Sequence, residues 1–138
     1  MIILDTNVVS EPMKHRGDAK VQAWLDRQDV ETLYLTATSL SELLLGAELV
    51  PQGKRRQALA DALDALLNRL FGSRILPFDR PAAATYAALV AKARARGHSI
   101  SVADGQIAAI AQRHGFTVAS RDTKPFKAVG VPCVNPWI

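Results

Sequence analysis

Short apolar runs alternate with longer stretches of helical periodicity along this chain, and the alternation constrains the fold more than any other feature. The apolar runs are Met1–Leu4, Leu33–Leu35, Ile75–Phe78, Phe116–Ala119 and Val131–Val134. The helical stretches between them are Ala19–Arg27, Ser39–Leu49, Lys54–Phe71, Pro81–Arg96 and Ser101–His114. Strands that alternate with helices typically form a mostly parallel sheet with helices on both faces. We therefore expect an α/β fold.

Length and composition place limits on the class of protein. The chain has 138 residues, no repeat and no long linker, so we expect residues 1–138 to form one domain. No apolar run approaches the roughly 18 residues of a membrane span, and the start MIILDTN does not resemble a signal peptide. We expect a soluble, cytoplasmic protein without membrane contact. The single cysteine, Cys133, excludes an intramolecular disulfide.

Four acidic residues occupy positions that a parallel sheet brings together. Three of them follow expected strands, and the fourth begins a helix that leads into one; they are Asp5, Glu42, Asp104 and Asp122. Ligands of open parallel sheets bind beyond the carboxyl ends of the strands. Carboxylates crowded there repel one another unless a cation neutralises them, and Mg²⁺ or Mn²⁺ prefers such oxygen ligands. Taken singly, each acid has an alternative role in a cap or a turn, as in the capping-box pattern from Ser39 to Glu42.

The charge balance favours a polyanionic partner. Lys and Arg number 17 against 13 Asp and Glu, which gives a net charge of +4. Without the four acids described above, nine acids remain against 17 bases. An acidic pocket within a basic surface suits a metal-dependent enzyme that acts on a nucleic acid.

Several motifs resemble those of a known family. They are Ile2–Asn7, Ser39–Leu43 with Gly46, Val102–Ala108, Ala119–Asp122 and the C-terminal Gly130–Trp137. Together they resemble the PIN-domain family, and within it the VapC-type ribonuclease toxins of type II toxin–antitoxin modules, in a FitB-like branch. The matches run in order across essentially the whole chain.

This resemblance carries expectations for fold, chemistry and partners. It implies a three-layer sandwich with a parallel five-stranded sheet. It also implies Mg²⁺-dependent cleavage of RNA, with Mn²⁺ as a possible substitute, by the cluster of Asp5, Glu42, Asp104 and Asp122. A cognate antitoxin is the implied protein partner. Many relatives carry asparagine at the position of Asp122 and an acid a few residues later. The segment Asp122–Phe126 lacks this later acid, so the number of metal ions, one or two, is left open.

Further residues are assigned weaker roles. Thr6, Asn7, Ser39 and Ser120 are candidates for supporting the acids, although Ser39 is also a candidate N-cap. Arg121, Lys124 and Lys127 adjoin Asp122 and are candidate contacts to RNA. The apolar stripe of Lys54–Phe71, together with Ser39–Leu49, is the expected interface of a homodimer, for which Leu63 and Leu67 are the residues to test.

Two other functions remain open at this stage. A catalytically silent RNA-binding module would need no acidic cluster. A phosphoryl-transfer domain would also be α/β with an acid after its first strand, but the haloacid-type phosphatases need a second aspartate where this chain has Asn7.

Overall fold

The five strands form one fully parallel sheet. The computed structural model describes residues 1–138. The strands are β1 (Ile2–Leu4), β2 (Leu33–Thr36), β3 (Ile75–Leu76), β4 (Thr117–Ala119) and β5 (Cys133–Val134). Their order in the sheet is β3-β2-β1-β4-β5, so β1 lies at the centre and pairs with β2 and β4. This confirms the expected parallel five-stranded sheet.

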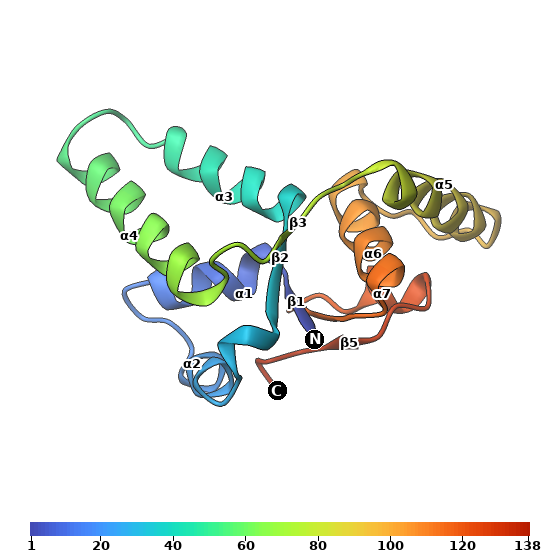
Figure 1. Ribbon diagram of the computed structural model, residues 1–138, viewed down its shortest axis with the longest axis horizontal. Coiled ribbons are helices and arrows are strands. Elements are labelled where there is room, and N and C mark those ends of the chain that lie inside the picture. The colour runs from blue at the N-terminus through green and yellow to red at the C-terminus, as the bar shows by residue number, and fades with distance from the viewer.

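Helices cover both faces of this sheet, which gives three layers (Figure 1). One layer contains α1 (Thr6–Ser10), α2 (Ala19–Asp26), α3 (Ala37–Glu48) and α4 (Lys54–Leu70). The other contains α5 (Arg80–Ala95), α6 (Val102–His114) and α7 (Lys124–Ala128). Each layer encloses its own hydrophobic core against the sheet. Figure 1 shows α3 and α4 to one side of the strands and α5 to α7 to the other.

The start of α3 differs from the sequence expectation. Strand β2 continues through Thr36, and the helix begins directly at Ala37. The Thr36 side chain therefore caps the helix and accepts a hydrogen bond of 3.0 Å from the Ser39 backbone N–H. The prediction that Ser39 caps α3 is wrong, because Ser39 already lies inside the first turn. Asp79 caps α5 and Ser101 caps α6, each through its side chain.

The apolar stripe of α4 belongs to the core of this chain. Leu63, Leu66 and Leu70 are buried, and Leu67 packs against the same core from a partly buried position. The expectation that this stripe forms a dimer interface therefore fails for Leu63, which is only 3% exposed.

Two short helices escaped the sequence analysis. Helices α1 and α7 have five residues each, too few for apolar periodicity to be recognised. Both follow strands directly or after a short turn, so they lie close to the candidate acids. No helix is both long enough and apolar enough to cross a membrane.

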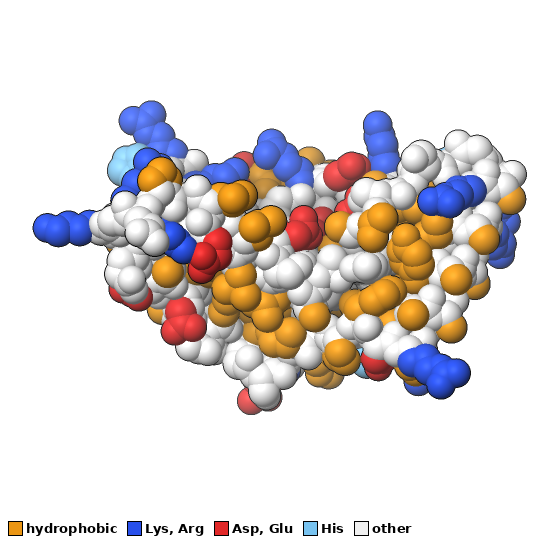
Figure 2. Space-filling view, turned by 90° about the horizontal axis from the view of Figure 1, so that it is seen from above, with side chains coloured by type: hydrophobic (Ala, Val, Ile, Leu, Met, Phe, Trp, Pro, Cys, Tyr) orange, Lys and Arg blue, Asp and Glu red, His pale blue; other side chains and the backbone are white.

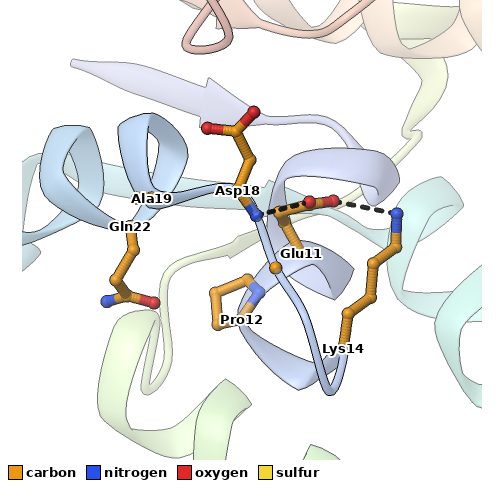
Figure 3. A pocket seen from close by; sticks show the side chains of 7 residues that line it. Glu11, Pro12, Lys14, Asp18, Ala19 and Gln22 are labelled. Atoms are coloured by element: carbon orange, nitrogen blue, oxygen red, sulfur yellow. Dashed lines mark hydrogen bonds and ion pairs between the residues drawn. The ribbon is translucent and has the colours of Figure 1, made fainter.

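Glu11 is a buried acid in the short 3₁₀ helix Glu11–Met13 that links α1 to α2 (Figure 3). Its Oε1 accepts a hydrogen bond of 2.9 Å from the Asp18 backbone N–H, and its Oε2 pairs with Lys14 Nζ at 2.9 Å. The backbone hydrogen bond and the ion pair lower the pKa of Glu11 below its ordinary value. Glu11 thus fixes the loop that turns the chain towards α2.

Candidate active site

Asp5 forms the buried centre of the candidate site. It directly follows β1, the central strand, and is only 8% exposed. Its Oδ1 accepts a hydrogen bond of 2.8 Å from the Thr6 N–H and so caps α1. Its Oδ2 accepts a second bond from the Ser120 hydroxyl at 2.7 Å. Asp5 therefore has the cap role, and its second oxygen is held by Ser120, so the cap leaves a role in the site open to it.

Glu42 reaches the site from α3. It lies on the exposed side of this helix, and its Oε1 accepts a hydrogen bond of 3.3 Å from the Thr6 hydroxyl. Thr6 therefore contacts two of the acids, one through its backbone and one through its side chain. This contact supports the expectation that Thr6 assists the site.

Asp104 approaches from the first turn of α6. It is half-buried, and its backbone N–H donates to the Ser101 hydroxyl at 3.1 Å. The Thr38 hydroxyl donates a bond of 2.8 Å to Oε1 of Gln106 and so joins α3 to α6. Thr38 lies one turn before Glu42, and Gln106 lies two residues after Asp104. This bond, which the sequence analysis did not foresee, fixes the spacing of the two acidic helices.

Asp122 lies in the loop that follows β4. The Ser120 Oγ accepts a hydrogen bond of 3.3 Å from the Asp122 N–H, and Asp122 Oδ1 accepts one of 3.2 Å from the Lys124 N–H. The Arg121 N–H donates to Asn7 Oδ1 at 3.4 Å. Asn7 and Ser120 therefore hold this loop against β1 and α1.

The C-terminal segment also holds this loop. The Asn135 side chain donates a hydrogen bond of 3.1 Å to the Arg121 carbonyl and accepts one of 2.9 Å from the Trp137 N–H. The Arg121 guanidinium lies over the Trp137 ring, 5.2 Å from its centroid. Both residues belong to the C-terminal motif Gly130–Trp137, for which the sequence suggested no contact with this loop.

The acids influence one another electrostatically. Partial desolvation raises the pKa of Glu42, and the negative charges of Asp5 and Asp104 raise it further. Burial likewise raises the pKa of Asp104, with added contributions from Asp5 and Asp122. Opposing hydrogen bonds from Thr6 and Ser101 only partly offset these effects. All four acids therefore lie close enough for their charges to interact.

The candidate ligands are all carboxylate oxygens, the type of ligand that a hard divalent cation prefers. No three His, Cys, Asp or Glu side chains lie close enough together to hold a metal ion with their present positions. The four carboxylates are nevertheless crowded and carry no neutralising Lys or Arg partner, since the two ion pairs of the chain join Lys14 to Glu11 and Arg56 to Glu48. Glu42 and Asp122 are both exposed, so their side chains are free to rotate.

Ser39 behaves differently from the other supporting candidates. It is fully buried, and its hydroxyl has no hydrogen-bond partner. The structure therefore gives it no contact with any of the four acids. Among the candidate RNA contacts, Arg121 adjoins the site, whereas Lys127 lines a separate pocket between α5, α6 and α7.

An apolar groove opens beside Glu42. It has a volume of about 270 Å³, and its lining includes Met13, Leu43, Leu59 and Leu63 from the 3₁₀ helix, α3 and α4. The view from above looks onto the edge where the strands end (Figure 2). Figure 2 shows acidic side chains near the middle of this face, with hydrophobic side chains between them and bases mainly around the rim.

Comparison with known proteins points to one family. The family model described as "PIN domain" matches residues 2–132. The chain is 48% identical to the VapC ribonuclease Y4jK of Sinorhizobium fredii, over 99% of this chain and 98% of that protein. It is 47% identical to Toxin FitB of Neisseria gonorrhoeae, over 99% of both. Among solved structures, that of FitAB bound to an IR36 DNA fragment matches with a TM-score of 0.95 and 45% identity, over 100% of this chain and 96% of that one.

Proposed function

The chain belongs to the PIN-domain family, and from this membership we propose that it is a metal-dependent endoribonuclease, the toxin of a type II toxin–antitoxin module. The observation that carries the proposal is the set of hydrogen bonds by which Thr6 joins Asp5 to Glu42 and Ser120 joins Asp5 to Asp122. The charge interactions of Asp104 with Asp5 and Asp122 support its membership of the same candidate cluster. The name of the relative Y4jK, a VapC ribonuclease, supports cleavage of RNA.

The four carboxylates would hold the divalent cation, Mg²⁺ or Mn²⁺. Such a cation, when bound, supplies positive charge to a phosphate oxygen and lowers the pKa of water. The protein contributes the positions of its ligands. Ser120 and the Thr6 backbone each hold one oxygen of Asp5, and the Thr6 hydroxyl holds one oxygen of Glu42. These bonds preorganise the carboxylates and reduce the rearrangement that binding of the cation requires.

Arg121 is the residue best placed to contact the RNA backbone at this site. It lies between Ser120 and Asp122 in the sequence, and stacking on Trp137 restricts its side chain. A guanidinium held in this way can bind phosphate oxygens through two parallel hydrogen bonds. Arg121 would thus position the phosphodiester next to the acids.

The direct test of this proposal uses mixed cellular RNA and the purified chain. We expect cleavage with Mg²⁺ or Mn²⁺, and no cleavage after addition of excess EDTA. The Asp104→Asn variant should be inactive under all conditions. Undiminished cleavage in EDTA would overturn the metal requirement, and absence of cleavage with every metal and RNA would overturn the nuclease assignment.

We further propose an antitoxin partner that covers the acidic pocket, because the relative FitB is named as a toxin. The groove beside Glu42 offers such a partner an apolar anchoring surface next to carboxylates that a basic side chain would neutralise. Expression of the active chain alone should arrest growth of the host, whereas the Asp104→Asn variant should not. Harmless accumulation of the active chain at high level would contradict the toxin assignment.

A further inference from the structure

The charges of this chain are distributed unequally between the two helical layers. Residues 1–79 carry nine Lys or Arg and 11 Asp or Glu, whereas residues 80–138 carry eight Lys or Arg and only two acids. Those two acids are Asp104 and Asp122, both members of the candidate active site. Helices α5, α6 and α7 form one layer (Figure 1) and all lie within residues 80–138. This layer therefore has no acidic side chain outside the site.

The bases of this layer converge on a pocket. Lys92 and Arg96 from the end of α5, Gln112 from α6 and Lys127 from α7 line a cavity of about 280 Å³. No acid lines this cavity, and none of its three cations takes part in an ion pair. Alanine, valine and leucine side chains form the rest of the wall, so the cationic groups surround a partly apolar hollow.

Three unpaired cations around one hollow repel each other, and a bound anion relieves that repulsion. Lys and Arg supply charge-assisted hydrogen bonds to phosphate oxygens, and the Gln112 amide supplies a neutral donor. Gln112 lies eight residues beyond Asp104 on the same helix, which corresponds to a separation of about 12 Å along its axis. The pocket is therefore distinct from the acids and lies on the same helical layer.

We propose that the pocket lined by Lys92, Arg96, Gln112 and Lys127 binds a backbone phosphate of the RNA at a point remote from the cleaved bond. This inference rests on the proposed function, since it concerns the same substrate. A remote phosphate contact would raise the affinity for RNA without taking part in the chemical step. It would also give the RNA a preferred path over α5, α6 and α7 rather than over α1 to α4.

A simpler explanation for these bases is their position at helix ends. Lys92 and Lys127 lie in the last turns of α5 and α7, and Arg96 is the C-cap of α5. Cations at such positions stabilise a helix through its dipole and need no ligand. The two explanations differ in what a substitution changes: RNA binding in the first case, thermal stability alone in the second.

The test compares two double variants of equal charge. Lys92→Ala with Arg96→Ala removes two cations from the pocket, and Lys20→Ala with Arg27→Ala removes two exposed cations at α2, on the other layer. Binding of a fluorescent single-stranded RNA is measured in EDTA at several salt concentrations, together with KM and kcat for cleavage in Mg²⁺. For the pocket variant, we expect the slope of log K against log salt to become less steep by about 0.7, the value for one lost phosphate contact on a single strand. We also expect KM to rise at unchanged kcat, and the α2 variant to behave like the unmodified chain.

Equal effects of the two double variants would overturn the inference, because they would show a general charge effect. A lower melting temperature of the pocket variant with unchanged RNA affinity would also overturn it in favour of the helix-end explanation. Tighter binding of single-stranded DNA than of RNA of the same sequence, measured in the same way, would contradict the assignment to RNA. In these cases cleavage by the unmodified chain would persist, whereas failure of the proposed function would appear as absence of cleavage by the unmodified chain itself.

Discussion

Ser120 and Asp5 are 115 residues apart in the sequence, yet the Ser120 hydroxyl donates a hydrogen bond of 2.7 Å to Asp5 Oδ2. The bond joins the ends of the neighbouring strands β1 and β4. The same hydroxyl accepts the Asp122 N–H. Ser120 therefore couples two acids of the candidate site through one buried oxygen atom.

Replacement of Ser120 by alanine should reduce both stability and activity. It leaves one oxygen of Asp5 and the Asp122 N–H without these partners, and loss of a hydrogen bond to a charged group costs about 1–3 kcal/mol. We expect a decrease in RNA cleavage of about 10- to 100-fold, the range found when a residue that orients a metal ligand is removed. Urea unfolding and initial cleavage rates measure the two effects. Ser41→Ala on the exposed face of α3 is the matched control, and equal activities of the two variants would refute the role of Ser120.

Two glycines inside helices should respond oppositely to alanine. A Cβ at Gly105 would lie 2.7 Å from Tyr86 Cε2 and 3.2 Å from Val90 Cγ2, so α5 and α6 would have to separate. We expect Gly105→Ala to destabilise the protein by about 1–3 kcal/mol. A Cβ at Gly46 in α3 meets no atom within 4 Å, and Gly46→Ala should stabilise by up to about 1 kcal/mol. Thermal unfolding of both variants tests the close packing of α5 on α6, which a stable Gly105→Ala protein would disprove.

The buried acid Glu11 makes stability depend on pH. Its pKa lies below the ordinary value of 4.5 because the Asp18 N–H and Lys14 stabilise the carboxylate. The stabilisation is therefore complete above pH 4.5 and is lost as the pH falls through the lowered pKa of the folded state. We expect Glu11→Gln to cost about 1–3 kcal/mol at pH 7 and much less below pH 4. Urea unfolding at several pH values measures this difference, with the exposed Glu31→Gln as control; a cost that is independent of pH would contradict the account.

The exposed leucines favour α3 over α4 as the interface of the expected homodimer. Leu44, Leu45 and Leu49 are 48%, 57% and 73% exposed on α3, while Leu63, Leu66 and Leu70 of α4 lie in the chain's own core. We expect the 14.9 kDa chain to have twice this mass by light scattering, and Leu45→Glu to halve it. Val30→Glu, at an exposed position outside α3, should leave the mass unchanged. A monomeric unmodified chain at micromolar concentration would disprove the dimer.

The sequence was sufficient to predict a parallel five-stranded sheet and to single out four acids as candidates for the site. Both follow from local patterns, since apolar runs mark strands and the residue after a parallel strand lies at the functional edge. The start of α3 was mispredicted because Ser39 and Thr36 are both good caps, and only the length of β2 selects Thr36. The bonds from Thr38 to Gln106 and from Asn135 to Arg121 join residues distant in sequence, so no local pattern could indicate them.

The burial of Glu11 could not be predicted from the sequence either. A glutamate in a loop is ordinarily exposed, and its partner is a backbone N–H seven residues away, which has no signature in the sequence. The same reason explains the exposure of the α3 leucines, since periodicity identifies an apolar face but not the element that covers it.

The central claim is that the four carboxylates bind a divalent cation and that this cation is required for cleavage of RNA. The most direct measurement is the binding of Mn²⁺ by calorimetry, made in parallel with RNA cleavage on the same preparations of the unmodified chain, Asp5→Asn, Asp104→Asn and the control Asp61→Asn on α4. We predict that the unmodified chain and the control bind Mn²⁺ and cleave RNA, whereas Asp5→Asn and Asp104→Asn remain folded and lose both properties. Cleavage at the full rate by a variant that no longer binds Mn²⁺ would contradict the claim.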